Sequence, residues 1–307
     1  MVEGDAEPVL ALEVERPPEI FMPPPPPRLT RFYGNIDFAK DVFRTKSIAF
    51  VHVSLMNDPF DPYFEFVTDF EGRYPAILSW IEANHGAKEV RWFKSVMPYQ
   101  SWRNSLSGIK KRNANLKENS FLLCASAPLA DLEPAHNLYM WGHYCSGHRG
   151  VAIEFDAERV ATSVVEHQTK NHPDWPKDQR VWTPVIYQDK IDRLTAADLH
   201  EFLKAPLGRE LQTKFAFHLN TVSRLKSTVW RPEQEWRLMW HNDELETKIY
   251  KVPILPGAVR RVFIGLRLTD DVAAQIAAEC RATFPEAEVL KGSARPGEFA
   301  LDFRPVR

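Results

Sequence analysis

One short segment of the chain, residues 140–156 with the sequence MWGHYCSGHRGVAIEFD, concentrates side chains that can do chemistry. Its chemically capable members are Trp141, His143, Tyr144, Cys145 and His148. They stand among three glycines, which give the backbone conformational freedom. The apolar VAIEF that follows is typical of a buried strand. We therefore expect a loop held by a strand, which is a common setting for a binding site.

The spacing His143, Cys145, His148 (H-x-C-x-x-H) supplies ligands that suit zinc. A complete site needs at least one more ligand, and the sequence has no CxxC and no second His/Cys pair at standard spacing. We therefore predict no metal, and favour hydrogen-bonded structural histidines. Cys145 could act as a nucleophile beside a histidine, but a buried thiol is the commoner case.

A second group, Glu233, Glu235 and Arg237, lies in the segment WRPEQEWRLMW. Read as a strand, it places these three on one face and the tryptophans 236 and 240 on the other. Carboxylates two residues apart on one strand face are roughly 7 Å apart, so one could be catalytic while a base holds the other. An exposed Arg-Glu ladder is the alternative. The flanking tryptophans favour an enclosed aromatic site.

A third group combines RFY at residues 31–33 with NDPFD at residues 57–61. Arg31 could hold a phosphate in bidentate fashion, and Asn57 or Asp58 could bind a sugar hydroxyl. Turn formation alone also explains the NDP sequence.

The strands and helices that the sequence predicts around these groups indicate an α+β fold. Residues 1–28 are proline-rich and acidic, with few large apolar side chains, and we expect them to be disordered. Residues 29–307 are expected to form one α+β domain with a mostly antiparallel central sheet and inserted helices. The expected strands are 29–33, 47–55, 121–127, 150–156, 181–189, 230–240, 248–253, 260–266 and a last one near 298–303. The expected helices are 35–47, 74–86, 198–227 (the longest) and 269–285.

Composition limits the class of protein. The 307 residues are 44% hydrophobic and 26% charged, as in a globular protein, and the net charge of −2 gives no global signature of binding to duplex nucleic acid or a membrane. The best local basic candidate is 105–117, which we interpret as a solvated loop or helix. Three dispersed cysteines, no run of membrane-spanning length and an acidic N-terminus predict a cytoplasmic protein with no membrane partner.

Together these segments resemble a widespread bacterial family, domain of unknown function 2971. The matching segments, in order, are LTRFY, NDPFD, MWGHYCSGHRGVAIEF, VIY and KSTVWRPEQEWR. The resemblance covers Leu29 to about Leu268. Asp61 stands where glutamate is more usual in that family. Membership of the family does not settle an activity.

A more distant resemblance is to ADP-ribosyltransferases, in which a basic residue, a polar residue and a late glutamate, often in an E-x-E pair, follow one another along the chain. Arg31, Ser54 and Glu235 stand in that order. The resemblance implies an ADP-ribosyltransferase-like fold, NAD as substrate and no metal. It makes Glu235 the catalytic carboxylate, which would stabilise an oxocarbenium-like cation, and lets Glu233 activate the acceptor. The cofactor-binding residues that it implies are Arg31, Tyr33, Ser54, Asn57, Trp141, His143 and Tyr144.

The function that this resemblance implies is that of an NAD-dependent ADP-ribosyltransferase or NAD glycohydrolase, as in a bacterial toxin or phage-defence effector. Its partners would be a nucleotide and an acceptor that is either protein or nucleic acid. One alternative is a non-catalytic module that binds a nucleotide or a partner. A second is a metal-dependent nuclease or hydrolase that uses His143, His148 and acidic residues.

Overall fold

A computed structural model describes residues 23–58, 60–62, 74–171, 182–191, 193–206, 222–242 and 246–306 of the chain. The described residues belong to two compact units. A helical unit holds residues 74–102 and 193–206, and a larger unit built on a β-sheet holds the rest. The prediction of one domain from residue 29 onward stays a prediction, because a compact unit is not by itself an independently folding domain.

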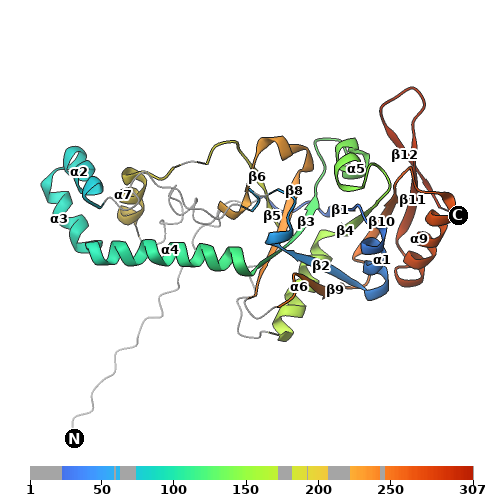
Figure 1. The fold of residues 1–307 in the computed structure, drawn as a ribbon, viewed down its shortest axis with the longest axis horizontal. Coiled ribbons are helices and arrows are strands. Elements are labelled where there is room, and N and C mark those ends of the chain that lie inside the picture. Colours follow the sequence, from blue (N-terminus) through green and yellow to red (C-terminus); the bar gives the residue numbers. More distant parts are fainter. Residues whose placement is uncertain are drawn as a thin grey trace, which may run out of the picture. The chain divides into compact units, whose positions relative to one another are not determined.

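The larger unit is an α+β structure with a large, mostly antiparallel sheet, as predicted (Figure 1). Its strands are β1 (Arg28–Tyr33), β2 (Ser47–His52), β3 (Ser120–Ser126), β4 (Val151–Asp156), β5 (Thr183–Pro184), β6 (Ile186–Tyr187), β7 (Leu225–Lys226), β8 (Glu235–His241), β9 (Ile249–Pro253), β10 (Val259–Ile264), β11 (Glu288–Ala294) and β12 (Leu301–Pro305). Its helices are α1 (Ile36–Thr45), α5 (Leu138–Tyr144), α6 (Ala157–Asn171) and α9 (Asp270–Thr283), with 3-10 turns η1 (Val53–Leu55), η2 (Pro134–His136), η4 (Val222–Arg224) and η5 (Thr228–Glu233).

The main sheet has the order β12-β11-β10-β4-β1-β3-β2-β9, and β8 pairs with β3 and β5. Neighbours are antiparallel except β10 and β11, which are parallel because α9 connects them as a crossover. One face of the sheet carries the main hydrophobic core, to which α1, α6 and α9 contribute. The other face carries a smaller core around Trp141 of α5. Both faces of the central strands are therefore covered.

The sheet splits at β3. Strand β8 pairs with one edge of β3 along its whole length, from Ser120↔His241 to Ser126↔Glu235. The other edge is shared: β1 pairs with it at Ser126, and β2 pairs with it at Phe121 and Leu122. Strands β1 and β2 therefore diverge from one another along the same edge, and α1 connects them.

Two segments that carry the site differ from the sequence prediction. The MWGHY sequence forms helix α5 rather than a loop, because the Asn137 side chain accepts a hydrogen bond from the Tyr139 N–H and caps its first turn. The WRPE sequence is the 3-10 turn η5 rather than strand, since Pro232 cannot donate a ladder hydrogen bond and Gln234 adopts φ 45°. Glu233 therefore precedes the strand, which begins at Glu235.

The bounds of several other helices and strands also differ from those predicted. The predicted strand 47–55 ends at His52, and 181–189 contains two short strands, β5 and β6. The predicted helix 198–227 overlaps α7 (Ala196–Lys204), but Leu225–Lys226 is strand β7, and residues 207–221 lie outside the described residues. Strand β11 was not predicted. The proline-rich residues 1–22 lie outside the described residues as well, so their disorder stays a prediction.

The helical unit contains α2 (Tyr74–His85), α3 (Ala87–Val96), α7 and the start of α4 (Tyr99–Asn119), which continues into the larger unit and is the longest described helix. Buried Phe93 and Trp102 pack around the Tyr74 ring. His200 of α7 pairs with Glu89 of α3 at 2.9 Å. No helix within the described ranges has the length and apolar character needed to span a membrane.

Candidate active site in the split of the sheet

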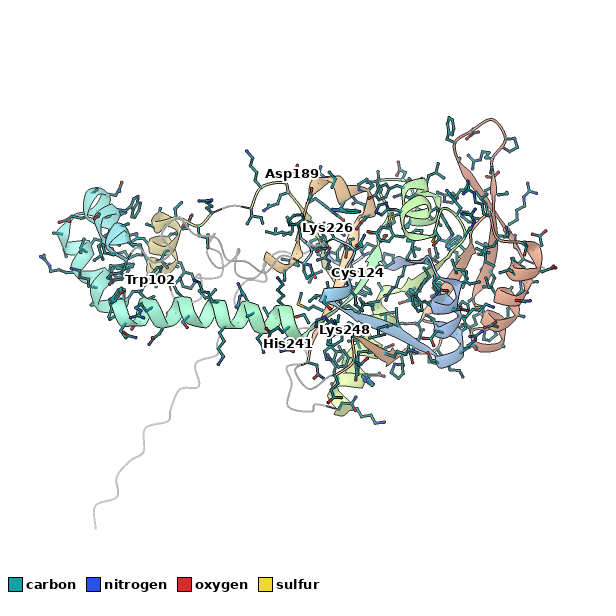
Figure 2. All side chains as sticks on the ribbon, viewed as in Figure 1. Trp102, Cys124, Asp189, Lys226, His241 and Lys248 are labelled. Carbon is teal, nitrogen blue, oxygen red and sulfur yellow. The ribbon has the colours of Figure 1, made fainter. Side chains whose placement is uncertain are left out.

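A cleft of about 860 Å³ opens where β1 and β2 diverge, and β3 contributes to its walls. Cys124 on β3 and Lys226 on β7, both labelled in Figure 2, line it together with residues far away in the sequence. The polar residues that matter for its chemistry are Arg31, Tyr33, Asn57, Asp61, Tyr144, Lys226, Glu233 and Glu235. The cleft thus brings together members of all three groups that the sequence singled out.

Lys226 is the centre of a buried charge cluster at one end of the cleft. Its ammonium nitrogen lies 2.6 Å from Glu233 Oε2, 2.8 Å from Glu235 Oε2 and 3.3 Å from Asp61 Oδ2. Strand β7, paired in parallel with β6, holds Lys226 in place. The Trp230 ring covers the same ammonium at 5.3 Å. The two glutamates therefore share one cation instead of lying free on a strand face.

Arg237 completes the cluster from β8. Its Nε donates to Glu235 Oε1 at 2.8 Å, and its Nη2 reaches Glu235 Oε2 at 3.0 Å and Asp61 Oδ2 at 2.5 Å. Arg237 and Glu235 share a strand face, while Trp236 and Trp240 point into the main core, which confirms the predicted alternation from Glu235 onward. Both oxygens of Glu235 are therefore occupied by cations.

Glu233 has a different second partner. The Tyr144 hydroxyl donates to Glu233 Oε1, and the Asn57 side-chain amide donates to the Tyr144 oxygen at 3.2 Å. The main-chain N–H of Glu235 donates to the Tyr187 hydroxyl at 2.8 Å. A chain of hydrogen bonds thus runs from Asn57 through Tyr144 to the cluster, along the wall of the cleft.

The cluster contains three carboxylates and two cations, so its charges do not cancel when all are ionised. Burial raises the pKa of Glu233 to about 7, against the opposing pull of Lys226. Burial also acts on Glu235, but Arg237 and Lys226 outweigh it and hold the pKa of that carboxyl well below its usual range. Glu235 is therefore a fixed anion, and Glu233 exchanges a proton near neutral pH.

The neighbouring groups are held in single protonation states. Burial would lower the pKa of Lys226, but the carboxylates of Glu235, Asp61 and Glu233 raise it, so Lys226 stays charged. Burial and the charge of Glu233 raise the pKa of Tyr144, which keeps its hydroxyl a donor. Burial and the charge of Glu235 raise the pKa of the Cys124 thiol, so Cys124 is not a thiolate nucleophile.

Arg31 lines the cleft from β1 and has a different environment from the other cations there. Lys251 pairs with Asp41, and Arg44 pairs with Glu279. The Arg31 guanidinium instead donates to the main-chain carbonyl of Ala49 on β2 at 2.6 Å and stacks over the Tyr33 ring at 5.5 Å. It bridges the two diverging strands and has donors available for an anion.

Three residues predicted for cofactor binding lie away from the cleft. Trp141 has no exposed surface and is covered by Phe32 and Phe303, so it cannot stack on a ligand as placed. Ser54 lies beyond the end of β2 and bonds to His52 at 2.8 Å. His143 stacks on Tyr139, with ring centroids 5.3 Å apart.

The histidines and cysteine of the MWGHY block have separate structural environments. The His148 ring stacks on Trp141, and the buried Cys145 thiol faces the main-chain oxygen of Val151 at 3.6 Å. Burial raises the pKa of Cys145 to about 12, which makes it a poor nucleophile. Within the described part of the chain, no group of three or more His, Cys, Asp or Glu side chains is placed to hold a metal ion.

Sequence reasoning missed Lys226 as the centre of the site, and it missed Tyr187 and the contact of Asp61 with Arg237. Lys226 and Tyr187 both lie in the matched segments KSTVWRPEQEWR and VIY, which is the signal that could have pointed to them. The sequence distinguished Asp61 only because glutamate is more usual at this position in the family. Its shorter side chain still reaches both Arg237 and Lys226.

Comparison with known proteins supports the family resemblance over part of the chain. Residues 140–238 match the model of the family described as "Protein of unknown function (DUF2971)". This segment contains most of α5, all of β4, Lys226 and both glutamates of the cluster. A search of curated proteins and a search of solved structures gave no match.

Proposed function

We propose that the protein is an enzyme that cleaves the nicotinamide–ribose bond of NAD⁺ and transfers ADP-ribose to an acceptor or to water. The observation that carries the proposal is the cleft between β1 and β2, in which Arg31 and the Glu233–Lys226–Glu235 cluster line the same space. A cleft of about 860 Å³ is of the size that binds small molecules and cofactors. The ADP-ribosyltransferase-like fold belongs to this proposal.

The two kinds of charge in the cleft match the two ends of NAD⁺. Arg31 can hold the pyrophosphate, since its guanidinium is held by Ala49 on one side and has donors available. Tyr33 beneath it adds a hydroxyl that has no hydrogen-bond partner among the described residues. The acidic cluster suits the ring end, where positive charge develops on the ribose as the bond breaks. Asn57 and Tyr144 line the wall near the cluster.

In the proposed reaction, the bond from ribose C1′ to the nicotinamide nitrogen breaks, and its electron pair leaves with nicotinamide. A new bond forms between C1′ and the attacking oxygen or nitrogen of the acceptor, which loses a proton. Glu233 takes this proton, because its pKa is about 7 and its ionised form is available. Glu235, held ionised by Arg237 and Lys226, supplies a fixed negative charge for the cationic transition state. This division of roles is the one that the resemblance to ADP-ribosyltransferases implies.

The decisive experiment measures nicotinamide release from NAD⁺ by the purified protein, with and without added protein and nucleic-acid acceptors. Glu233→Gln keeps the shape of the side chain but cannot accept a proton, and we expect release to fall by about 100-fold or more. Glu154→Gln is the matched control, because Glu154 is also buried and paired with an arginine but lies outside the cleft. No release by the wild type with any acceptor would contradict the proposal.

A non-catalytic nucleotide-binding module is the second candidate, and one observation favours it: both oxygens of Glu235 are already saturated by Lys226 and Arg237. Calorimetry with NAD⁺ separates the two functions, since a binding module retains intact NAD⁺ and an enzyme releases nicotinamide. A toxin or phage-defence role would follow from NAD⁺ depletion or acceptor modification. A cytoplasmic location, consistent with three free cysteines, also belongs to this proposal.

A further inference from the structure

The end of the cleft that lies on β9 is apolar. The cleft extends across the sheet from β8, which carries Glu235, to β9 at the sheet edge. Strand pairing places Ile249 of β9 beside Val51 of β2, and Val51 beside Leu122 of β3. All three line the cleft, so they form an apolar strip along its floor. Because neighbouring strands are about 4.8 Å apart, β9 is roughly 14 Å from β8 across the sheet.

Large apolar side chains at this end are exposed to solvent. Phe38 of α1 is 61% exposed, Leu55 of η1 is 50% exposed and Ile249 is 43% exposed, and all three line the cleft. Single exposed apolar residues are ordinary on a protein surface, but a group of them in one concave site indicates a ligand. We call Phe38, Val51, Leu55, Leu122 and Ile249 the apolar end of the cleft. The ring of Phe38 offers a face on which a flat ligand can stack.

One carboxylate near the apolar end lacks the partners that the neighbouring charges have. Lys251 pairs with Asp41 at 2.7 Å, and Arg44 pairs with Glu279 at 3.1 Å. Asp37, one turn before Asp41 on α1, is exposed and lines the cleft. Its carboxylate has neither an ion pair nor a hydrogen bond within the described ranges. Asp37 is therefore available to accept a hydrogen bond from a ligand, while Lys251 and Arg44 are already engaged.

Strand pairing places Arg31 between the apolar end and the charge cluster. On one side, Arg31 donates to the carbonyl of Ala49 on β2, which pairs with β9. On the other side, its neighbour Thr30 pairs with Ser126 of β3, and Ser126 pairs with Glu235. A central cation with different chemistry at its two sides matches a dinucleotide, in which a pyrophosphate joins two unlike nucleosides.

We propose that the apolar end of the cleft holds the adenosine half of NAD⁺ and selects NAD⁺ against NADP⁺. The adenine ring stacks on Phe38 and contacts Ile249. Asp37 accepts a hydrogen bond from the adenosine ribose, and its negative charge disfavours the 2′-phosphate of NADP⁺. The direction in which the dinucleotide lies rests on the proposed function, because the bond that breaks must face the acidic cluster. The binding of the adenosine half itself requires no cleavage.

The test is calorimetry with three probes: ADP, ADP that carries a further 2′-phosphate, and nicotinamide mononucleotide. We expect the wild type to bind ADP about tenfold more tightly than the 2′-phosphorylated form. Phe38→Ala should weaken the binding of ADP by about tenfold, because stacking of the base is lost, and should leave nicotinamide mononucleotide unaffected. Asp37→Asn should reduce the preference for ADP to about twofold, because the repulsion of the 2′-phosphate is removed.

The matched controls are Phe299→Ala and Asp271→Asn. Phe299 is fully exposed and lies outside the cleft, and Asp271 is an exposed residue in the first turn of α9, as Asp37 is in α1. Both controls should bind every probe within about twofold of the wild type. Phe38 and Asp37 are exposed as well, so neither substitution removes a core side chain.

Several outcomes overturn the adenosine site: no binding of ADP by the wild type, equal effects of Phe38→Ala and Phe299→Ala, or tighter binding of the 2′-phosphorylated form. Loss of nicotinamide mononucleotide binding in Phe38→Ala, with ADP unaffected, also overturns it, because the dinucleotide then lies in the reverse direction. The expected differences in ADP binding without any release of nicotinamide from NAD⁺ support the adenosine site and contradict the proposed cleavage. Nicotinamide release with unchanged ADP affinity in Phe38→Ala does the opposite.

Discussion

The ammonium of Lys226 lies 2.6 Å from Glu233 and 2.8 Å from Glu235, so one buried cation joins two carboxylates that approach it from a 3-10 turn and from a strand. This arrangement gives the two glutamates different chemistry. Glu235 is also clamped by Arg237 and stays ionised, whereas Glu233 shares its other oxygen with the neutral hydroxyl of Tyr144 and exchanges a proton near pH 7. The predictions below depend on this asymmetry.

Lys226→Met should destabilise the fold by about 3 to 5 kcal/mol, because it leaves buried carboxylates without their shared cation. The double variant Lys226→Met, Glu233→Gln removes one carboxylate as well and should recover a substantial part of the loss. Urea denaturation of the wild type, both single variants and the double variant measures the coupling. Purely additive effects of the two changes would show that the contact between the two side chains contributes little.

The rate of nicotinamide release should depend on the ionisation of Glu233. A base with a pKa of about 7 is active when deprotonated, so the rate should rise about tenfold per pH unit below 7 and level off above it. The residual rate of Glu233→Gln should lack this rise. Initial rates between pH 5.5 and 8.5 in buffers of constant ionic strength provide the measurement, and the same profile in both proteins would remove Glu233 from the proton transfer.

The free energy of unfolding should also depend on pH through the ionisation of Glu233. The pKa of Glu233 is raised from its usual 4.5 to about 7 in the folded protein. Between these values the folded state holds a proton that the unfolded state has lost, so the contribution of Glu233 to stability falls as pH rises from 4.5 to 7 and is constant above 7. It amounts to about 3 kcal/mol over this window. In Glu233→Gln the decline should be absent, and the difference between the two proteins, from urea titrations at pH 5, 6, 7 and 8, isolates it.

Arg31→Gln should weaken the binding of NAD⁺ by about tenfold to 100-fold, because a guanidinium hydrogen bond to a phosphate is lost in a partly buried site. The turnover rate at saturating NAD⁺ should change much less, since Arg31 is assigned to binding alone. Arg28→Gln is the control: it lies on the same strand but does not line the cleft. Calorimetry and steady-state kinetics test both expectations, and a fall in turnover with unchanged binding would contradict the assignment.

Trp141→Ala should lower the stability of the fold by about 3 to 5 kcal/mol and leave the affinity for NAD⁺ of the remaining folded protein unchanged. Trp141 has no exposed surface, and its indole N–H donates to the Ala135 carbonyl at 2.7 Å. Thermal unfolding gives the first value and calorimetry at low temperature gives the second. If Trp141→Ala lost NAD⁺ binding without losing stability, Trp141 would contact the ligand, as the sequence suggested.

The sequence by itself determined the α+β class, most of the strands and the residue types of the site. Alternating apolar residues fix which face of β4 or β8 is buried, because successive side chains of a strand point to opposite faces whatever surrounds it. The segments with MWGHY and EQEWR stood out from composition alone. These are local properties, and they were predicted correctly where the backbone followed the local pattern.

Only the tertiary structure decided which of these residues meet. Nothing local distinguishes Lys226 from any other lysine, and it became central because β6 and β7 place it under both glutamates and Asp61. Because Pro232 and the turn at Gln234 end the strand pattern, Glu233 lies in a 3-10 turn before the strand. The two carboxylates therefore converge on one cation. Packing against Phe32 and Phe303 made Trp141 part of the core. The pKa of a buried group depends on its neighbours in space, so the difference between Glu233 and Glu235 could not be read from a sequence in which they stand two residues apart.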